Sequence, residues 1–282
     1  MFDRSPIVPV LRMSGPIGIA TPLRPGLSLS TVAGPIEKAF SIKKAEAVAL
    51  VINSPGGSPV QSRLIYKRIR DRAQETGKTV YAFTEDVAAS GGYMLACAGD
   101  EIYADPSSIV GSIGVISASF GFDKFIARYD IERRVYTIGE NKSMLDPFQP
   151  EEAESIARLK TIQKDVHDVF TSLVKDSRGS RLKEGEETLF DGRVWAGGRA
   201  HELGLIDGLS DVRTKMRDVF GDKVKLRVVG RRRGLFSSLR GGMMGRAGVA
   251  GTGTSLGDEL RGLPDEVISA IEARALWARY GL

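Results

Sequence analysis

Cysteine and histidine are almost absent from this sequence. Cys97 is the only cysteine, and His167 and His201 are the only histidines. A disulfide within the chain is therefore excluded, and a metal site built from clustered cysteine and histidine ligands is not expected. We expect no metal and no other cofactor. We also expect Cys97 to be a small buried hydrophobic side chain rather than a nucleophile.

Long apolar runs are also missing. No stretch approaches the roughly 18 uninterrupted apolar residues that suggest a membrane-spanning helix, and Asp3, Arg4 and Arg12 interrupt the N-terminal segment. The sequence therefore predicts neither a transmembrane anchor nor a signal peptide, and we expect a cytoplasmic protein. Apolar residues make up 42% of the chain and charged residues 27%, as in an ordinary soluble globular protein.

Positive charge is concentrated in one segment. The net charge is +5, and the segment from Lys223 to Arg246 contains eight Lys or Arg residues and no acidic residue. We divide the chain into a compact domain (1–230), a basic, glycine-rich and flexible linker (231–262) and a C-terminal amphipathic helix (263–282). Two hypotheses stay open for the basic segment, namely peripheral contact with an anionic membrane and a solvated linker without a partner. No nucleic-acid-binding motif accompanies it, so nucleic acid is not an expected partner.

Buried strand patterns alternate with helical patterns along the compact domain. Strand patterns occur at 47–52, 79–83, 101–104 and 134–138. Helical patterns begin at 60, at 91 and, over the longest stretch, between 150 and 178. A turn is predicted at 85–90. This alternation of buried strands and helices predicts an α/β fold.

Ser90 has the local surroundings that a serine nucleophile needs. It lies between small residues in Ala-Ala-Ser-Gly-Gly-Tyr (88–93), at the start of a predicted short helix. A weakly nucleophilic hydroxyl also needs donors for the oxyanion, and backbone N–H groups of Gly56–Gly57 and of Gly91 could supply them. Simpler alternatives are a helix N-cap at Ser90 and an ordinary Pro-Gly turn at 55–57.

Residue type alone does not identify a general base. Neither His167 nor His201 has the glycine or aspartate neighbours of a positioned imidazole, which disfavours a Ser-His triad. A lysine can act as the base where burial disfavours its ammonium form. Lys142, in Gly-Glu-Asn-Lys-Ser (139–143), is a candidate. For any single lysine, however, a solvated surface position is the ordinary alternative.

Five short motifs occur together in a fixed order. They are Ser-Pro-Gly-Gly at 54–57, Ala-Ser-Gly-Gly-Tyr at 89–93, Gly-Ser-Ile-Gly-Val at 111–115, Gly-Glu-Asn-Lys-Ser at 139–143 and Gly-Arg-Val-Trp at 192–195. With them the chain resembles the S49 peptidase family of the signal peptide peptidase A type, in its short single-repeat form, over about 16–209. The resemblance implies a ClpP/crotonase-like α/β fold of repeated strand-strand-helix units, with the compact domain as the catalytic domain.

The resemblance also implies a role for each site residue. Ser90 corresponds to the nucleophile, Lys142 to the general base and Ser112 to the hydroxyl that orients the lysine, while Gly57 and Gly91 correspond to the oxyanion hole. The implied activity is that of a serine endopeptidase that cleaves signal peptides or other short apolar peptides through an acyl-enzyme.

The resemblance further implies a homo-oligomeric ring whose active sites are completed by neighbouring protomers. The dyad of Ser90 and Lys142 then forms either within one protomer or between two. Two other functions stay open, namely a crotonase-like acyl-CoA enzyme and a non-catalytic ring scaffold.

Overall fold

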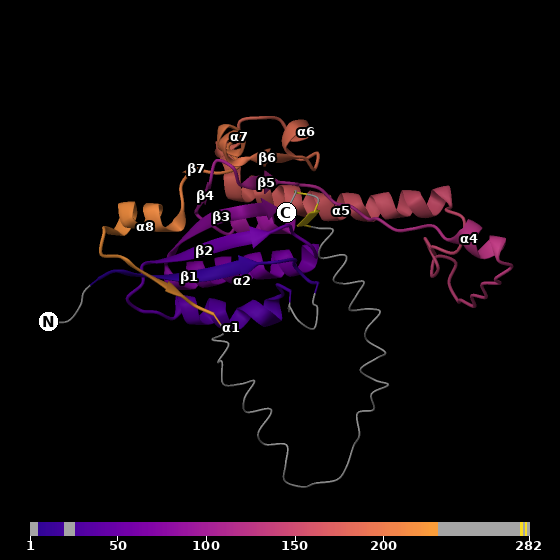
Figure 1. Ribbon diagram of the computed structural model, residues 1–282, viewed down its shortest axis with the longest axis horizontal. Helices are drawn as coiled ribbons and strands as arrows, with labels where there is room; N and C mark the ends of the chain where they lie inside the picture. Colours follow the sequence, from indigo (N-terminus) through magenta and orange to yellow (C-terminus); the bar gives the residue numbers. More distant parts are fainter. Residues whose placement is uncertain (1–4, 20–25, 231–276, 279, 281–282) are drawn as a thin grey trace, which may run out of the picture.

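An eight-stranded sheet forms the centre of the structure (Figure 1). The computed structural model describes residues 5–19, 26–230, 277–278 and 280. The strands are β1 (Ile7–Ser14), β2 (Ala47–Ser54), β3 (Thr79–Ala89), β4 (Glu101–Ala104), β5 (Ile109–Gly111), β6 (Val194–Ala196), β7 (Gly208–Leu209) and β8 (Lys225–Val228). The helices are α1 (Leu29–Phe40), α2 (Pro59–Thr76), α3 (Gly91–Ala96), α4 (Asp123–Arg128), α5 (Ala153–Arg178), α6 (Glu186–Leu189), α7 (Gly197–Glu202) and α8 (Val212–Phe220), with a 3-10 turn, η1, at Gly179–Arg181.

Strand β3 joins the parts of the sheet. The strand order is β6-β5-β3-β2-β1-β8, and β4 pairs with both β3 and β7. All pairs are parallel except β5 with β6. Along the edge away from β2, β3 pairs first with β4 and then, through Val87–Ala89, with β5. The predicted turn at 85–90 is therefore wrong up to Ala89, because pairing with a strand distant in sequence keeps this segment extended.

Both faces of the sheet are buried. Along β2, alternate side chains face opposite sides, as a strand requires. Val48, Leu50 and Ile52 belong to the larger core, which includes residues of α1, α2, α3 and α5. Ala47, Ala49 and Val51 belong to a smaller core that contains Met216 of α8. The uninterrupted apolar pattern at 47–52 follows from this two-sided burial.

Helix α5 extends well beyond the body of the protein (Figure 1). Its 26 residues correspond to a length of about 39 Å. Only the C-terminal half is anchored in the core, through residues such as Phe170 and Val174, whereas Ser155 is the one buried residue of the first half. Residues 116–149, here called the arm, lie next to this free half and include α4.

The arm is largely exposed and carries large apolar side chains. Tyr136 is 90% exposed and Ile138 is 100% exposed. The strand predicted at 134–138 is wrong for the single chain, because these residues have no strand partner among the described residues. The arm is held together locally by stacking of Phe122 on Phe148 and by an ion pair of Arg133 with Asp146, at 2.9 Å.

Helices α2, α3 and α5 and strands β2 and β4 confirm the corresponding sequence predictions. The predicted linker (231–262) lies outside the described residues, and so does the C-terminal helix (263–282) apart from 277–278 and 280. Of the basic segment, the part from Arg231 onward lies outside the described residues as well, and the hypothesis of membrane contact stays a prediction. None of the described helices combines the length and the apolar character needed to span a bilayer.

A buried ion pair joins the C-terminal end of α5 to the segment before β7. The guanidinium of Arg178, whose side chain has no exposed surface, donates to both carboxylate oxygens of Asp207 at 2.7 and 2.9 Å. It also donates to the carbonyl of Gly204 at 3.0 Å, and the backbone N–H of Ile102 donates to Asp207 at 2.7 Å. These contacts tie α5, β4 and the β7 segment together.

Replacing Arg178 with alanine should lower the free energy of unfolding by about 3–5 kcal/mol, because it leaves the Asp207 carboxylate without its main partner in a half-buried position. Urea denaturation measures this loss. Arg158→Ala is the matched control on the same helix, since Arg158 forms an exposed pair with Glu154, and it should cost at most about 1 kcal/mol. Equal losses in the two variants would contradict a structural role for the buried pair.

Acid should weaken the same interaction. Burial by itself raises the pKa of Asp207, but the hydrogen bonds and charge of Arg178, with the Ile102 N–H, outweigh it and hold this pKa below its usual value near 3.8. A carboxyl with a depressed folded-state pKa stabilises the fold above its unfolded-state pKa and loses this contribution as pH falls through the folded value. The stability difference between wild type and Arg178→Ala, measured by urea denaturation, should therefore shrink below about pH 4. A constant difference down to pH 2 would contradict this assignment.

Candidate active site

Ser90 lies at a strained junction between a strand and a helix. It follows the last residue of β3, precedes the first residue of α3 and has φ 53° and ψ −123°. For a residue other than glycine such a backbone costs on the order of 1–3 kcal/mol. Its N–H donates to the carbonyl of Gly111 at 2.8 Å, and its side chain makes no capping hydrogen bond to α3. The N-cap alternative therefore does not account for the hydroxyl, which lines a pocket instead.

The glycine loop after β2 lies directly against Ser90. Gly56 has φ +96°, and a Cβ added there would lie 2.8 Å from the backbone N of Gly91 and 2.8 Å from the Cβ of Ser90. Only glycine allows this close approach. Among the described residues, the N–H groups of Gly57 and Gly91 donate no hydrogen bond, so both remain available to an acceptor beside Ser90.

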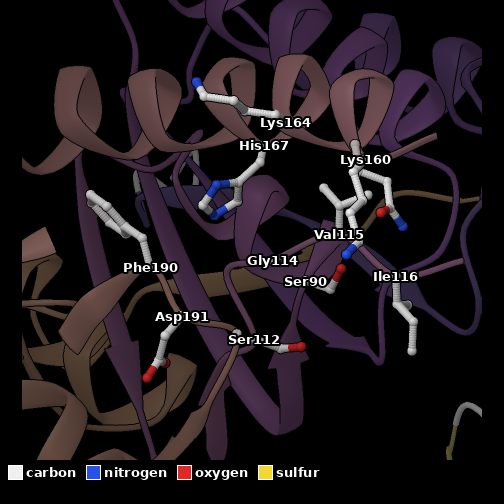
Figure 2. A pocket seen from close by; sticks show the side chains of 12 residues that line it. Ser90, Ser112, Gly114, Val115, Ile116, Lys160, Lys164, His167, Phe190 and Asp191 are labelled. Carbon is white, nitrogen blue, oxygen red and sulfur yellow. The ribbon is translucent and has the colours of Figure 1, made fainter. Parts of the chain in front are cut away.

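Ser112 lines the same pocket as Ser90 (Figure 2). Its φ is 54°, its N–H donates to the carbonyl of Arg193 at 2.8 Å, and only 8% of its surface is exposed. The pocket has a volume of about 410 Å³. Its apolar lining comes from Val115, Ile116 and Phe190. The structure thus brings Ser90, Ser112 and the two glycines together.

Helix α5 contributes polar side chains to this pocket that the sequence analysis did not assign to it. Lys160, Gln163, Lys164 and His167 line it, spaced at i, i+3, i+4 and i+7 along one helix face. In Figure 2 the imidazole of His167 points from α5 into the pocket. The buried Nε2 atom of His167 has no hydrogen-bond partner. Helical spacing alone places these residues on one face but does not reveal what that face covers.

Lys142 is not brought to Ser90 within one chain. It is exposed, lies in the arm and does not line the pocket. The arm runs along the free half of α5 and continues beyond the outer end of this helix, far from the sheet (Figure 1). The predicted dyad is therefore not assembled by a single protomer in this structure.

Cys97, at the end of α3, is buried and inert. Burial raises the pKa of its thiol to about 12, so the thiolate is scarce near neutral pH. Its carbonyl accepts a hydrogen bond from the hydroxyl of Ser177 at 2.9 Å. This confirms the prediction of a small buried side chain without a nucleophilic role.

The comparison with protein families decides the assignment of the chain. The model for peptidase family S49 matches residues 72–224, more than half of the sequence. The chain belongs to peptidase family S49. Together with the sheet of mainly parallel strands, this membership confirms the predicted ClpP/crotonase-like α/β fold.

Two of the relatives carry protease names. The chain is 34% identical to the chloroplastic serine protease SPPA of Arabidopsis thaliana, over 66% of this chain and 30% of that protein. It is 28% identical to protease 4 of Haemophilus influenzae, over 63% of this chain and 28% of that protein. In both cases the chain spans less than a third of the relative's length.

A third relative has a different name. The chain is 53% identical, over 98% of its length, to a Brucella abortus protein named Na(+)/H(+) antiporter NhaA, of which it covers 37%. The residues that match family S49 fall inside this shared segment. The antiporter name applies to that protein as a whole, and it assigns no activity to this S49 chain.

Replacing Gly56 with alanine should slow acylation of Ser90 by a serine-directed probe about 100-fold, because the new methyl group would displace Ser90 and Gly91. The measurement is the labelling rate of the intact protein. Gly15→Ala is the matched control, since Gly15 has a similar φ of +105° but nothing within 4 Å of an added Cβ. This control should lose stability and keep its labelling rate. Equal labelling of Gly56→Ala and wild type would contradict the assigned contact.

Proposed function

We propose that this S49 chain is a serine endopeptidase with Ser90 as its nucleophile. The observation that carries the proposal is the positive φ of Ser90, where the hydroxyl caps no helix and lines a pocket. The glycine loop lies against Ser90, and the N–H groups of Gly57 and Gly91 donate no hydrogen bond within the described residues. Strain of this kind persists where the surrounding structure holds it in place, and it is concentrated at functional sites.

In the proposed reaction, Oγ of Ser90 attacks the carbonyl carbon of the scissile peptide bond while a base takes the hydroxyl proton. The N–H groups of Gly57 and Gly91 donate to the resulting oxyanion. The base then passes its proton to the leaving amine, the C–N bond breaks and an acyl-enzyme remains. Water, deprotonated by the same base, hydrolyses the ester and restores Ser90.

Lys142 of a neighbouring protomer is the base in this proposal. A lysine accepts a proton near neutral pH only where burial disfavours its ammonium form. Lys142 is exposed in the single chain, and the arm around it exposes a set of large apolar side chains that a neighbour would cover. They are Phe120, Phe125, Tyr129, Ile131, Tyr136 and Ile138. Packing of the arm against the next copy would desolvate Lys142 and complete the site, with Ser112 orienting its amine.

In this proposal one surface of each copy, the arm, meets a different surface of the next, and such head-to-tail contacts form a ring where the rotation between copies closes. Exposed apolar side chains on α5 support the arrangement, since Ile162 in the free half is 53% exposed and Val169, just inside the anchored half, is 47% exposed. These side chains are apolar, but the core of their own protomer does not cover them. A head-to-tail contact would bury both exposed regions.

Short apolar peptides, including signal peptides, are the proposed substrates. Val115, Ile116 and Phe190 give the pocket apolar surface on which such side chains could pack. A crotonase-like reaction typically uses carboxylates over the substrate, whereas the one carboxylate lining this pocket, Asp191, is engaged by Arg193 at 2.6 Å. The pocket thus favours the peptidase over the acyl-CoA alternative.

Mixing two inactive variants tests the shared dyad. Ser90→Ala and Lys142→Ala should each fold and assemble but cleave no peptide. When the two are co-expressed in equal amounts, about a quarter of the sites should combine an intact Ser90 from one copy with an intact Lys142 from the next. Cleavage of a fluorogenic peptide library measures the recovery. A dyad within one protomer predicts no recovery, so an inactive mixed assembly would contradict the proposal.

A further inference from the structure

Four hydrogen-bond donors form one wall of the pocket beside Ser90. They are Lys160, Gln163, Lys164 and His167 of α5, here called the donor wall. Figure 2 shows the Lys160 side chain reaching from α5 toward the Ser90 hydroxyl, with His167 further along the same helix. Lys160 and Lys164 are exposed, whereas Gln163 and His167 are partly buried. A buried polar atom in such a wall needs a hydrogen-bond partner, which an apolar ligand cannot supply.

Two of these donors lack partners of their own. Lys164 forms an ion pair with Asp168 at 2.5 Å. Lys160, in contrast, forms no ion pair within the described part of the chain, and the buried Nε2 of His167 has no hydrogen-bond partner. A buried nitrogen without a partner costs free energy that a bound acceptor would recover.

The only acidic group on the pocket lining is already neutralised. Asp191 accepts from the side chain of Arg193 at 2.6 Å and from its backbone N–H at 3.1 Å. Besides the Ser90 and Ser112 hydroxyls and the Gln163 amide, the polar side chains that line the pocket without a partner in the described residues are therefore those of Lys160 and His167. This combination suits an anionic acceptor.

We propose that the donor wall binds a carboxylate of the substrate, held by Lys160 and His167, so that this enzyme prefers peptides carrying a negative charge near the scissile bond. The inference rests on the proposed function, since it treats the pocket as the substrate site of Ser90. The carboxylate can come from an Asp or Glu side chain or from the free C-terminus of a short peptide. Both sources present the same planar pair of oxygens to the wall.

Matched peptides distinguish these sources. One series carries Glu or the isosteric Gln at each position near the cleaved bond, and each peptide is made with a free or an amidated C-terminus. In one of the two comparisons, Glu against Gln or free against amidated C-terminus, we expect the peptide with the carboxylate to be favoured. The expected advantage is about tenfold in kcat/KM with the wild-type protein and about tenfold in Kd with full-length Ser90→Ala. Fluorescence anisotropy of labelled peptides measures the binding.

Variants of the donor wall then locate the effect. Lys160→Met and His167→Phe should each bring the ratio of kcat/KM between the charged and the neutral peptide close to one. Lys160→Glu should reverse the preference, so that a Lys-containing peptide is cleaved better than its Glu counterpart. A variant that is merely misfolded cannot produce this reversal. Arg158→Met is the control, because it removes one positive charge from the same helix outside the pocket, and it should leave the preference unchanged.

The two proposals fail in different ways. Cleavage by wild type without any preference between the charged and neutral peptides would overturn the carboxylate site and leave the peptidase assignment standing. Absence of all cleavage would overturn the peptidase assignment, and binding to Ser90→Ala would still decide the carboxylate site. Equal binding of charged and neutral peptides, or no binding, would overturn it.

Discussion

The left-handed backbone at Ser90 is the constraint on which the candidate site depends. Strand β3 must stay paired with β5 up to Ala89, and α3 must begin at the next residue after Ser90, for the hydroxyl to face the pocket. The carbonyl of Gly111 holds the Ser90 N–H at 2.8 Å, and Gly56 can lie against Ser90 only because it has no Cβ. Strand pairing, not the hydroxyl itself, therefore sets the position of the Ser90 side chain.

A second constraint is the apolar surface that α5 and the arm leave exposed in the single chain. Half of α5 lies beyond the core, and large apolar side chains of the arm face solvent in the single chain. Burying apolar surface contributes about 25 cal/mol per Å². In the proposed ring, the same contact would stabilise the assembly and remove water from Lys142. One interaction would thus link oligomerisation to the activity of the base.

Elements with a strong local pattern could be predicted from the sequence. Strand β2 shows an uninterrupted apolar run and α5 a long helical repeat, and both occur as expected. The second half of β3 is not predicted, because pairing with β5 and, at Ala88, with Ser54 of β2 keeps it extended, and its own residues do not encode these contacts. The segment 134–138 has a strand-like composition, but composition cannot supply the partner strand that it lacks in one chain.

By itself the sequence determined the order of the motifs, the alternation of strands and helices and the resemblance to family S49, since all of these depend on residues close together along the chain. Only the tertiary structure decided that Ser90 and Ser112 share a pocket, that the glycine loop lies against Ser90, that α5 turns Lys160 and His167 toward this pocket, and that Lys142 lies apart on the arm. The physical reason is that distances between remote segments follow from which surfaces pack together. A local pattern fixes the period of a segment, not its neighbours.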